Sequence, residues 1–162
     1  MPLDMVYKSV NRLEHIIVHT DLTNGIWVPL YPGSWFQPLM FDCTQGGFAH
    51  LLKVEPGRLL PHYHPSIVHG YTIQGQWRYL ENNWVGRPGT YIYESAGEVH
   101  TLVVDGPEPL IAFFYVSAGI FHVDPQTGKQ LGYDDGFTLL ELARKHYREN
   151  GLDLAQLEAL VR

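Results

Sequence analysis

The sequence predicts a single all-β domain, a sandwich or a barrel, that is followed by a short helical tail. Two observations predict it. Short apolar runs recur with turn residues between them, such as Pro56-Gly57 and Asp105-Gly106-Pro107, and the chain contains 16 Gly and 11 Pro. Near residue 137 the apolar spacing becomes helical. One domain is the default for 162 residues, so we expect 1–162 to form one unit, with the barrel at about 14–133 and helices at about 137–161.

The expected strands are segments with alternating or continuously apolar residues, bounded by turn residues. They are Glu14–His19, Ile26–Leu30, Trp35–Phe41, Phe48–Glu55, Ile67–Gln74, Trp77–Glu81, Thr90–Tyr93, Thr101–Val104, Leu110–Val116 and Ile120–Val123. Many strands at short, regular spacing favour a sandwich or a barrel.

The C-terminal segment carries the signals of two helices. Apolar residues between Phe137 and Tyr147 recur at helical spacing. Thr138, with Glu141 three residues later, fits a capping box at the start of this helix. Asp153 can cap a second, shorter helix. We expect this tail to pack on the barrel or on a partner subunit.

Composition excludes several classes of function. The net charge of −6, without a basic cluster, argues against a nucleic-acid partner. No apolar run reaches the ~18 residues that a membrane span needs. The start Met1-Pro2-Leu3-Asp4 lacks the basic and apolar regions of a signal peptide. The single Cys43 cannot form an internal disulfide. We therefore expect a cytoplasmic protein with no nucleic-acid or membrane partner.

Three histidines form the strongest chemical signal. His62 and His64 are two residues apart, so in an extended strand both side chains point to the same face, with backbones about 6.5 Å apart. His100, on a later strand, could bring a third imidazole to them. Three imidazoles can hold one metal ion and leave positions open for water, substrate or oxygen. His62, His64 and His100 are thus the predicted metal ligands.

The segments around these histidines resemble the two motifs of the cupin family. In the first motif, Gly57 leads to His62 and His64, and Gly75 ends the stretch. In the second motif, Gly89 and Gly97 precede His100, and Ser replaces the usual Pro at position 95. The resemblance covers about residues 46–117 and implies a jelly-roll barrel. Many cupins add a glutamate to the three histidines, but Val68 occupies the position expected for it. The resemblance therefore implies a site of three histidines.

Two families of iron cupins share features with this chain. The stretch from Glu94 to His100 resembles the acetylacetone-cleaving (β-diketone) dioxygenases. The tail from Gly132 to Thr138 is similar to that of 2,4′-dihydroxyacetophenone dioxygenase, which is related to the cupin domain of ChrR anti-sigma factors. Both resemblances imply a non-haem Fe(II) dioxygenase that cleaves a carbon–carbon bond of a small enolisable ketone with O2.

The chemistry of three imidazoles agrees with this class. Three neutral ligands leave the +2 charge of a divalent metal intact, which favours an anionic, chelating substrate such as an enolate. Fe(II) is the expected cofactor because the reaction is a redox reaction. Zn(II) or another divalent metal could bind the same imidazoles, but zinc has no redox chemistry.

Further side chains are candidates for the substrate site. Glu94 could orient a histidine or accept the enol proton, or equally be a charge at the rim in water. His69 could line the site or be structural, and Arg78 could pair with an anionic substrate or face solvent. We predict Glu94 and His69 as catalytic. The predicted substrate pocket comprises Arg78, Tyr71, Tyr93 and Phe114. The histidines outside the motifs are expected to be structural: His15, His19, His50, His122 and His146.

Two other functions remain open. The same barrel could be a zinc-binding ligand sensor without turnover, as the likeness to ChrR allows. A metal-dependent isomerase or hydrolase is a third alternative. The expected partners are a small ketone, O2 and further copies of the chain in a homodimer or homotetramer.

Overall fold

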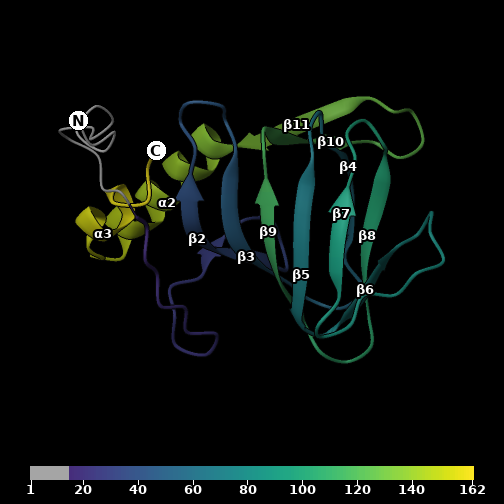
Figure 1. Cartoon of the computed structure of the whole chain (residues 1–162), viewed down its shortest axis with the longest axis horizontal. Coiled ribbons are helices and arrows are strands. Elements are labelled where there is room, and N and C mark those ends of the chain that lie inside the picture. Colours follow the sequence, from purple (N-terminus) through teal and green to yellow (C-terminus); the bar gives the residue numbers. More distant parts are fainter. Residues whose placement is uncertain (1–14) are drawn as a thin grey trace, which may run out of the picture.

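Two antiparallel sheets face each other in the computed structural model, which describes residues 15–162 (Figure 1). One sheet has the strand order β1-β2-β3-β9-β5-β7 and the other β11-β10-β4-β8-β6. The strands are β1 (Val28–Pro29), β2 (Ser34–Phe41), β3 (Phe48–Val54), β4 (Leu59–Tyr63), β5 (Val68–Gln74), β6 (Gln76–Tyr79), β7 (Tyr91–Glu94), β8 (His100–Asp105), β9 (Leu110–Val116), β10 (Gly119–Val123) and β11 (Gln130–Asp135).

The core lies between the two sheets because the strands alternate inward and outward residues. On β5, Val68, Gly70 and Thr72 are buried, whereas Tyr71 between them is half exposed. Trp77 on β6 is buried in the same core. The inner faces are thus mainly apolar, and any polar side chain that points inward stands out.

Two helices follow the barrel, α2 (Gly136–Glu149) and α3 (Leu154–Glu158), and lie together beside β2 (Figure 1). The predicted capping box at Thr138 and Glu141 is wrong. Asp135 caps α2: its extended backbone lets the carboxylate accept from the Thr138 backbone N–H, and its own N–H donates to the Thr138 hydroxyl. Asp153 caps α3, as predicted.

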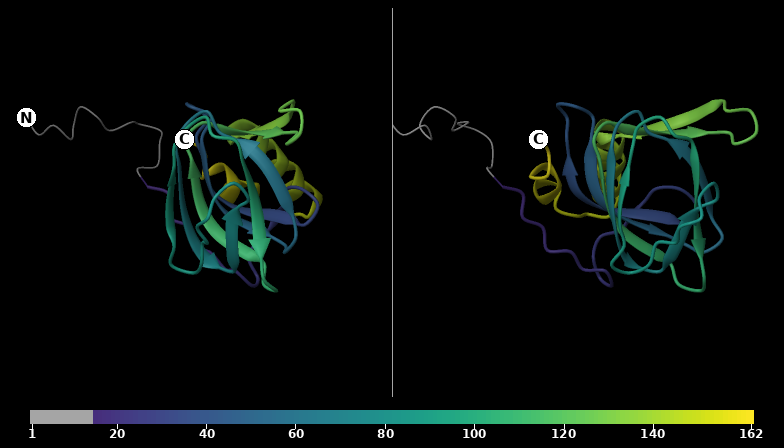
Figure 2. Two further views of the ribbon diagram at one scale, coloured as in Figure 1. Left: turned by 90° about the vertical axis from the view of Figure 1, so that its right-hand side faces the viewer. Right: turned by 45° about the vertical axis from the view of Figure 1, so that its right-hand side comes forward.

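The strand predictions differ from the structure in three places. Residues 15–19 of the predicted first strand are not a strand, and Glu14 lies outside the described residues. β4 was missed because Pro61 interrupts its apolar pattern. β11 was missed because it is mostly polar; pairing with β10 holds it, in a hairpin that extends beyond the barrel (Figure 2).

Candidate metal centre

The structure brings the three predicted histidines together on the inner face of the five-stranded sheet. His62 on β4 is the register partner of His100 on β8, and His64 follows the end of β4. The ring centroids lie 4.7 Å apart for His62 and His100 and 5.1 Å apart for His64 and His100. All three side chains are buried. Antiparallel pairing of β4 with β8 is therefore what places the third imidazole beside the His-x-His pair.

Hydrogen bonds orient two of the rings. The Nδ1 atoms of His62 and His64 lie 2.7 Å from the carbonyl oxygens of Leu60 and Ser66, to which they donate. Donation from Nδ1 leaves Nε2 of each ring as the metal-binding atom, as is usual for histidine ligands. His100 instead stacks on Tyr79, with ring centroids 3.8 Å apart. Its Nε2 atom is buried and lacks a hydrogen-bond partner among the described residues.

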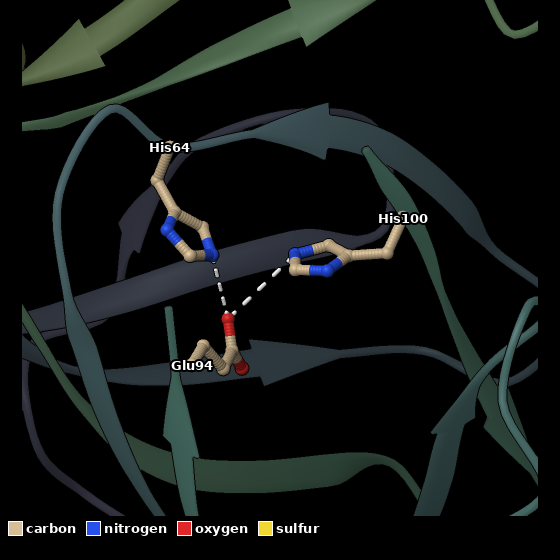
Figure 3. A group of neighbouring side chains, drawn as sticks. All are labelled: His64, Glu94 and His100. Carbon is tan, nitrogen blue, oxygen red and sulfur yellow. Dashed lines mark hydrogen bonds and ion pairs between the residues drawn. The ribbon is translucent and has the colours of Figure 1, made fainter. Parts of the chain in front are cut away.

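A carboxylate joins the histidines. Oε2 of Glu94 lies 2.8 Å from His64 Nε2 and 3.6 Å from His100 Nε2 (Figure 3). The Tyr79 hydroxyl donates to Oε1 over 2.6 Å. The atoms of His64, Glu94 and His100 that could bind a metal ion all lie within 4.8 Å of one another. The expectation of three neutral imidazoles without a carboxylate is thus corrected, because Glu94 is buried among the rings and not at a rim in water.

The position of Glu94 follows from the sheet register. Val68 on β5 is the direct cross-strand partner of Glu94 on β7. Both side chains point inward, so Glu94 presents its carboxylate at the level of the barrel where Val68 has none. The mixed set of imidazole nitrogens and a carboxylate oxygen suits Fe(II) or Zn(II). The unpartnered Nε2 of His100 is a further sign that the group fits a metal ion.

Burial and hydrogen bonding set the charge of the group. Burial lowers the pKa of His62 to about 3 and that of His100 to about 4, so both are neutral near pH 7. Burial also acts to lower the pKa of His64, but hydrogen bonds to Glu94 and to the Ser66 carbonyl outweigh it, and the pKa is raised. Burial and the charge of Glu94 raise the pKa of Tyr79 well above its usual value, so its hydroxyl remains a donor.

Metal binding should therefore compete with one proton. Below the raised pKa of His64, a metal must displace the proton that His64 shares with Glu94, whereas His62 and His100 stay neutral down to pH ~5. The Zn(II) association constant should rise about tenfold per pH unit from pH 5 and level off above the pKa of His64. Competition with a chromophoric chelator measures it. If all three histidines were protonated, the Zn(II) association constant would rise about a thousandfold per pH unit. That result would contradict the assigned charges.

Comparison with known proteins agrees with this geometry. A family described as the ChrR cupin-like domain matches residues 14–119. The chain belongs to this cupin family. An RmlC-like cupin protein from Ralstonia eutropha JMP134 is 26% identical, with a TM-score of 0.75 over 82% of this chain and 88% of that chain. The predicted all-β cupin fold with a C-terminal helical tail is confirmed.

Two further structures are similar to this cupin. A protein of unknown function with a cupin-like fold, also from Ralstonia eutropha, is 27% identical, with a TM-score of 0.67 over 74% of this chain and 75% of that chain. The acetylacetone dioxygenase of Acinetobacter johnsonii is 13% identical, with a TM-score of 0.70 over 85% and 98%. At that identity the likeness shows the fold alone. Curated protein sequences gave no match. Within residues 15–162, no helix is long and apolar enough to cross a membrane.

Most other predicted site residues of the cupin lie on the outside of the barrel. His69, Tyr71 and Tyr93 occupy outward positions on β5 and β7, and His69 Nδ1 lies 2.8 Å from the Tyr91 hydroxyl. Arg78 points outward from β6 and donates to Asp105 over 2.8 Å. His69, Arg78 and Tyr71 thus lie away from the interior cavity, whereas Tyr93 lines a separate pocket together with Glu94 and His100. Strand alternation explains it, because their neighbours in the chain point inward.

The interior of the cupin contains a cavity that the predicted site residues only partly describe. Phe114, one of the predicted pocket residues, is among its lining residues. Tyr79 was missed. It lies two residues after Trp77 on the same strand, so strand alternation places both side chains on the inner face. The cavity is lined by Leu30, Tyr31, Phe48, His50, Leu52, Leu60, His62, His64, Val68, Tyr79, Glu94, Leu102, Phe114, Val116, Ile120, His122, Asp134 and Leu139. The wall of the cavity is mostly apolar, and His62, His64 and Glu94 form part of it.

Proposed function

We propose that this cupin is a non-haem Fe(II) dioxygenase that cleaves a carbon–carbon bond of a small enolisable ketone with O2. The observation that carries the proposal is the buried group of His64, Glu94 and His100, with His62 beside it, at the wall of an apolar cavity. The dioxygenase name of the distant Acinetobacter structure supports the class of reaction. The substrate would be an aromatic hydroxyketone related to 2,4′-dihydroxyacetophenone or a β-diketone.

The residues have separate tasks in this proposal. His62, His64, His100 and Glu94 would hold Fe(II), which supplies a chelation site for the substrate and the redox chemistry for O2. If the three imidazoles alone hold the metal, Glu94 Oε2 is free to accept the proton that an enolisable ketone loses. Tyr79 donates to Oε1 and fixes the carboxylate. The apolar wall, which includes Phe114, keeps water away from the reacting carbons.

The reaction balances without another reductant. One carbon–carbon bond breaks, each of the two carbons gains one oxygen atom from O2, and the substrate supplies all four electrons. A hydroxyketone would give two carboxylic acids, whereas a β-diketone would give one acid and one dicarbonyl compound.

Oxygen uptake tests the proposal. Protein reconstituted anaerobically with Fe(II) or with Zn(II) is mixed with a panel of hydroxyketones and β-diketones, and O2 is followed with an electrode. We expect one O2 per ketone with Fe(II) and none with Zn(II), and loss of uptake in His100→Ala. Tight Fe(II) binding without oxygen uptake on any enolisable ketone would refute the dioxygenase.

That result would favour a second candidate, a zinc-binding ligand sensor. The membership of the chain in the ChrR cupin-like family supports this alternative. The carboxylate beside the histidines also supports it, because an imidazole and carboxylate set binds Zn(II) well.

A further inference from the structure

The metal-binding group separates two spaces. The interior cavity described above contacts His62 and His64 but not His100. A second space, which we call the outer pocket, contacts His100 but neither of the other two histidines. Glu94 and Tyr79 line both spaces, and the hydrogen bond from the Tyr79 hydroxyl to Glu94 Oε1 lies at the boundary between them. A metal ion held by this group would therefore face a different space on each side.

The outer pocket lies where the two sheets end, between β7 of one sheet and β6 and β8 of the other (Figure 1). Trp84, in the segment after β6, forms part of its wall. Main-chain hydrogen bonds in both directions between Trp77 and Gly86 hold this segment against β6. A Cβ at Gly86 would lie 2.4 Å from Trp77 Nε1, so a side chain there would clash. The Trp84 ring packs edge-on against Trp77 and Tyr79, with centroids 5.1 and 5.3 Å away, and the wall is thus preformed.

One end of the outer pocket is open to solvent and the other ends at the metal-binding group. Tyr93 on β7 is 53% exposed, and Ser95, which follows the strand, is exposed as well. Tyr79, Glu94 and His100, which also line the pocket, are buried. The exposed residues therefore form the mouth of the outer pocket, and the buried ones form its floor.

The two spaces differ greatly in size. The interior cavity has a volume of about 60 Å³, whereas the outer pocket has about 430 Å³. Sites for organic ligands usually measure about 300–1,000 Å³, and a single water already needs about 10–15 Å³. The interior cavity thus has room for a molecule as small as O2, and the outer pocket has room for a ring. No Lys or Arg of residues 15–162 lines the outer pocket, and its aromatic wall suits a flat, uncharged group.

We propose that the outer pocket binds the body of the organic ligand, which reaches the metal-binding group by passing between Trp84 and Tyr93. The chelating atoms of the ligand would lie at the floor, beside Glu94 and His100, and the interior cavity would be left to O2. The inference rests on the proposed function and deepens it by assigning one reactant to each side of the metal-binding group. Because the mouth is open, the ligand body can be longer than one ring.

Chelating probes of increasing length test this site without oxygen chemistry. Acetohydroxamic, benzohydroxamic and 4-phenylbenzohydroxamic acid bind a metal through the same two oxygens and differ only in the attached group. Their affinities for protein with a confirmed zinc content are measured by isothermal titration calorimetry. We expect one ring to improve binding about tenfold over the methyl group, because the ring covers apolar surface of the pocket wall. The two-ring probe should bind at least as tightly, whereas a site of about 60 Å³ could not hold it.

Substitutions on the two sides of the metal-binding group locate the ligand. Trp84→Ala removes a wall of the outer pocket and should abolish the preference for the ring, and Tyr93→Ala should reduce it about threefold. Tyr71→Ala is the matched control for Tyr93→Ala, because Tyr71 is a similarly exposed tyrosine on the neighbouring strand and lines neither space. Leu52→Phe narrows the interior cavity and should leave the preference unchanged.

Several results would overturn the outer-pocket site. They are exclusion of the two-ring probe, the absence of any ring preference or of any binding, and a preference that is kept in Tyr93→Ala or lost in Leu52→Phe. Circular dichroism checks that each variant is folded, and Tyr93→Ala decides alone if Trp84→Ala is not. A chain that retained no zinc would refute the metal centre and the site together. Failure of the dioxygenase alone would appear separately, as absent oxygen uptake with Fe(II).

Discussion

His100→Ala is expected to lose metal binding while the barrel remains folded. Among residues 15–162, His100 supplies the one Nε2 atom of the group that is buried without a hydrogen-bond partner, and a bound metal ion would satisfy it. Removing a ligand should weaken Zn(II) and Fe(II) affinity by about a hundredfold or more, given that loss of a residue that merely orients a ligand costs 10–100-fold. Metal content after dialysis measures the loss, and circular dichroism follows the fold.

The matched control for this substitution is His19→Ala, which removes an exposed imidazole outside the barrel. It should leave metal content unchanged, so that non-specific binding by histidine is accounted for. Full metal content in His100→Ala would contradict the assignment of the site.

Glu94→Gln should separate the role of the carboxylate from that of the imidazoles. Glutamine keeps the shape and removes the negative charge beside His64 and His100. We expect metal affinity at pH 7 to fall by about 10–100-fold. The pKa of His64 should also fall, because the bond to Glu94 is a main cause that raises it. The proton competition described above should then move to lower pH.

Glu98→Gln is the control for charge alone. Glu98 is exposed and four residues further along the chain, so its substitution removes the same charge from a position in water. Its effect on metal affinity should stay within about threefold at physiological salt. A Glu94→Gln protein that bound metal as tightly as the unchanged chain, and with the same pH profile, would show that the carboxylate takes no part in binding.

The sequence predicts those features that depend on short-range spacing. The parity of His62 and His64, the second motif before His100 and the change to helical spacing near residue 137 all lie within one segment each. Alternation along β5 places His69 on the face opposite to Val68, although His69 was predicted to be catalytic. Phe114 faces the interior cavity, and its contact with a substrate stays a prediction.

Features that depend on pairing between distant segments could not be predicted in this way. The pairing of β5 with β7 brings Glu94 opposite Val68, and from there Glu94 reaches His64. The sequence of either strand alone does not determine this register. His50 and His122 were expected to be structural for the same reason, since they line one cavity only when the two sheets pack against each other. The capping of α2 by Asp135 was missed because β11, which ends there, has no apolar alternation.

The direct opposition of Val68 and Glu94 has a consequence for how such barrels are classified and redesigned. Two neighbouring strands can supply an acidic side chain to the same point of the interior, because paired residues on one face lie only about 5 Å apart. A pattern that inspects β5 alone would describe this barrel as lacking an acidic ligand, although the acid is one strand away. Catalogues of these sites, and designs that transplant them, therefore need to compare positions in space across the sheet and not positions along the chain.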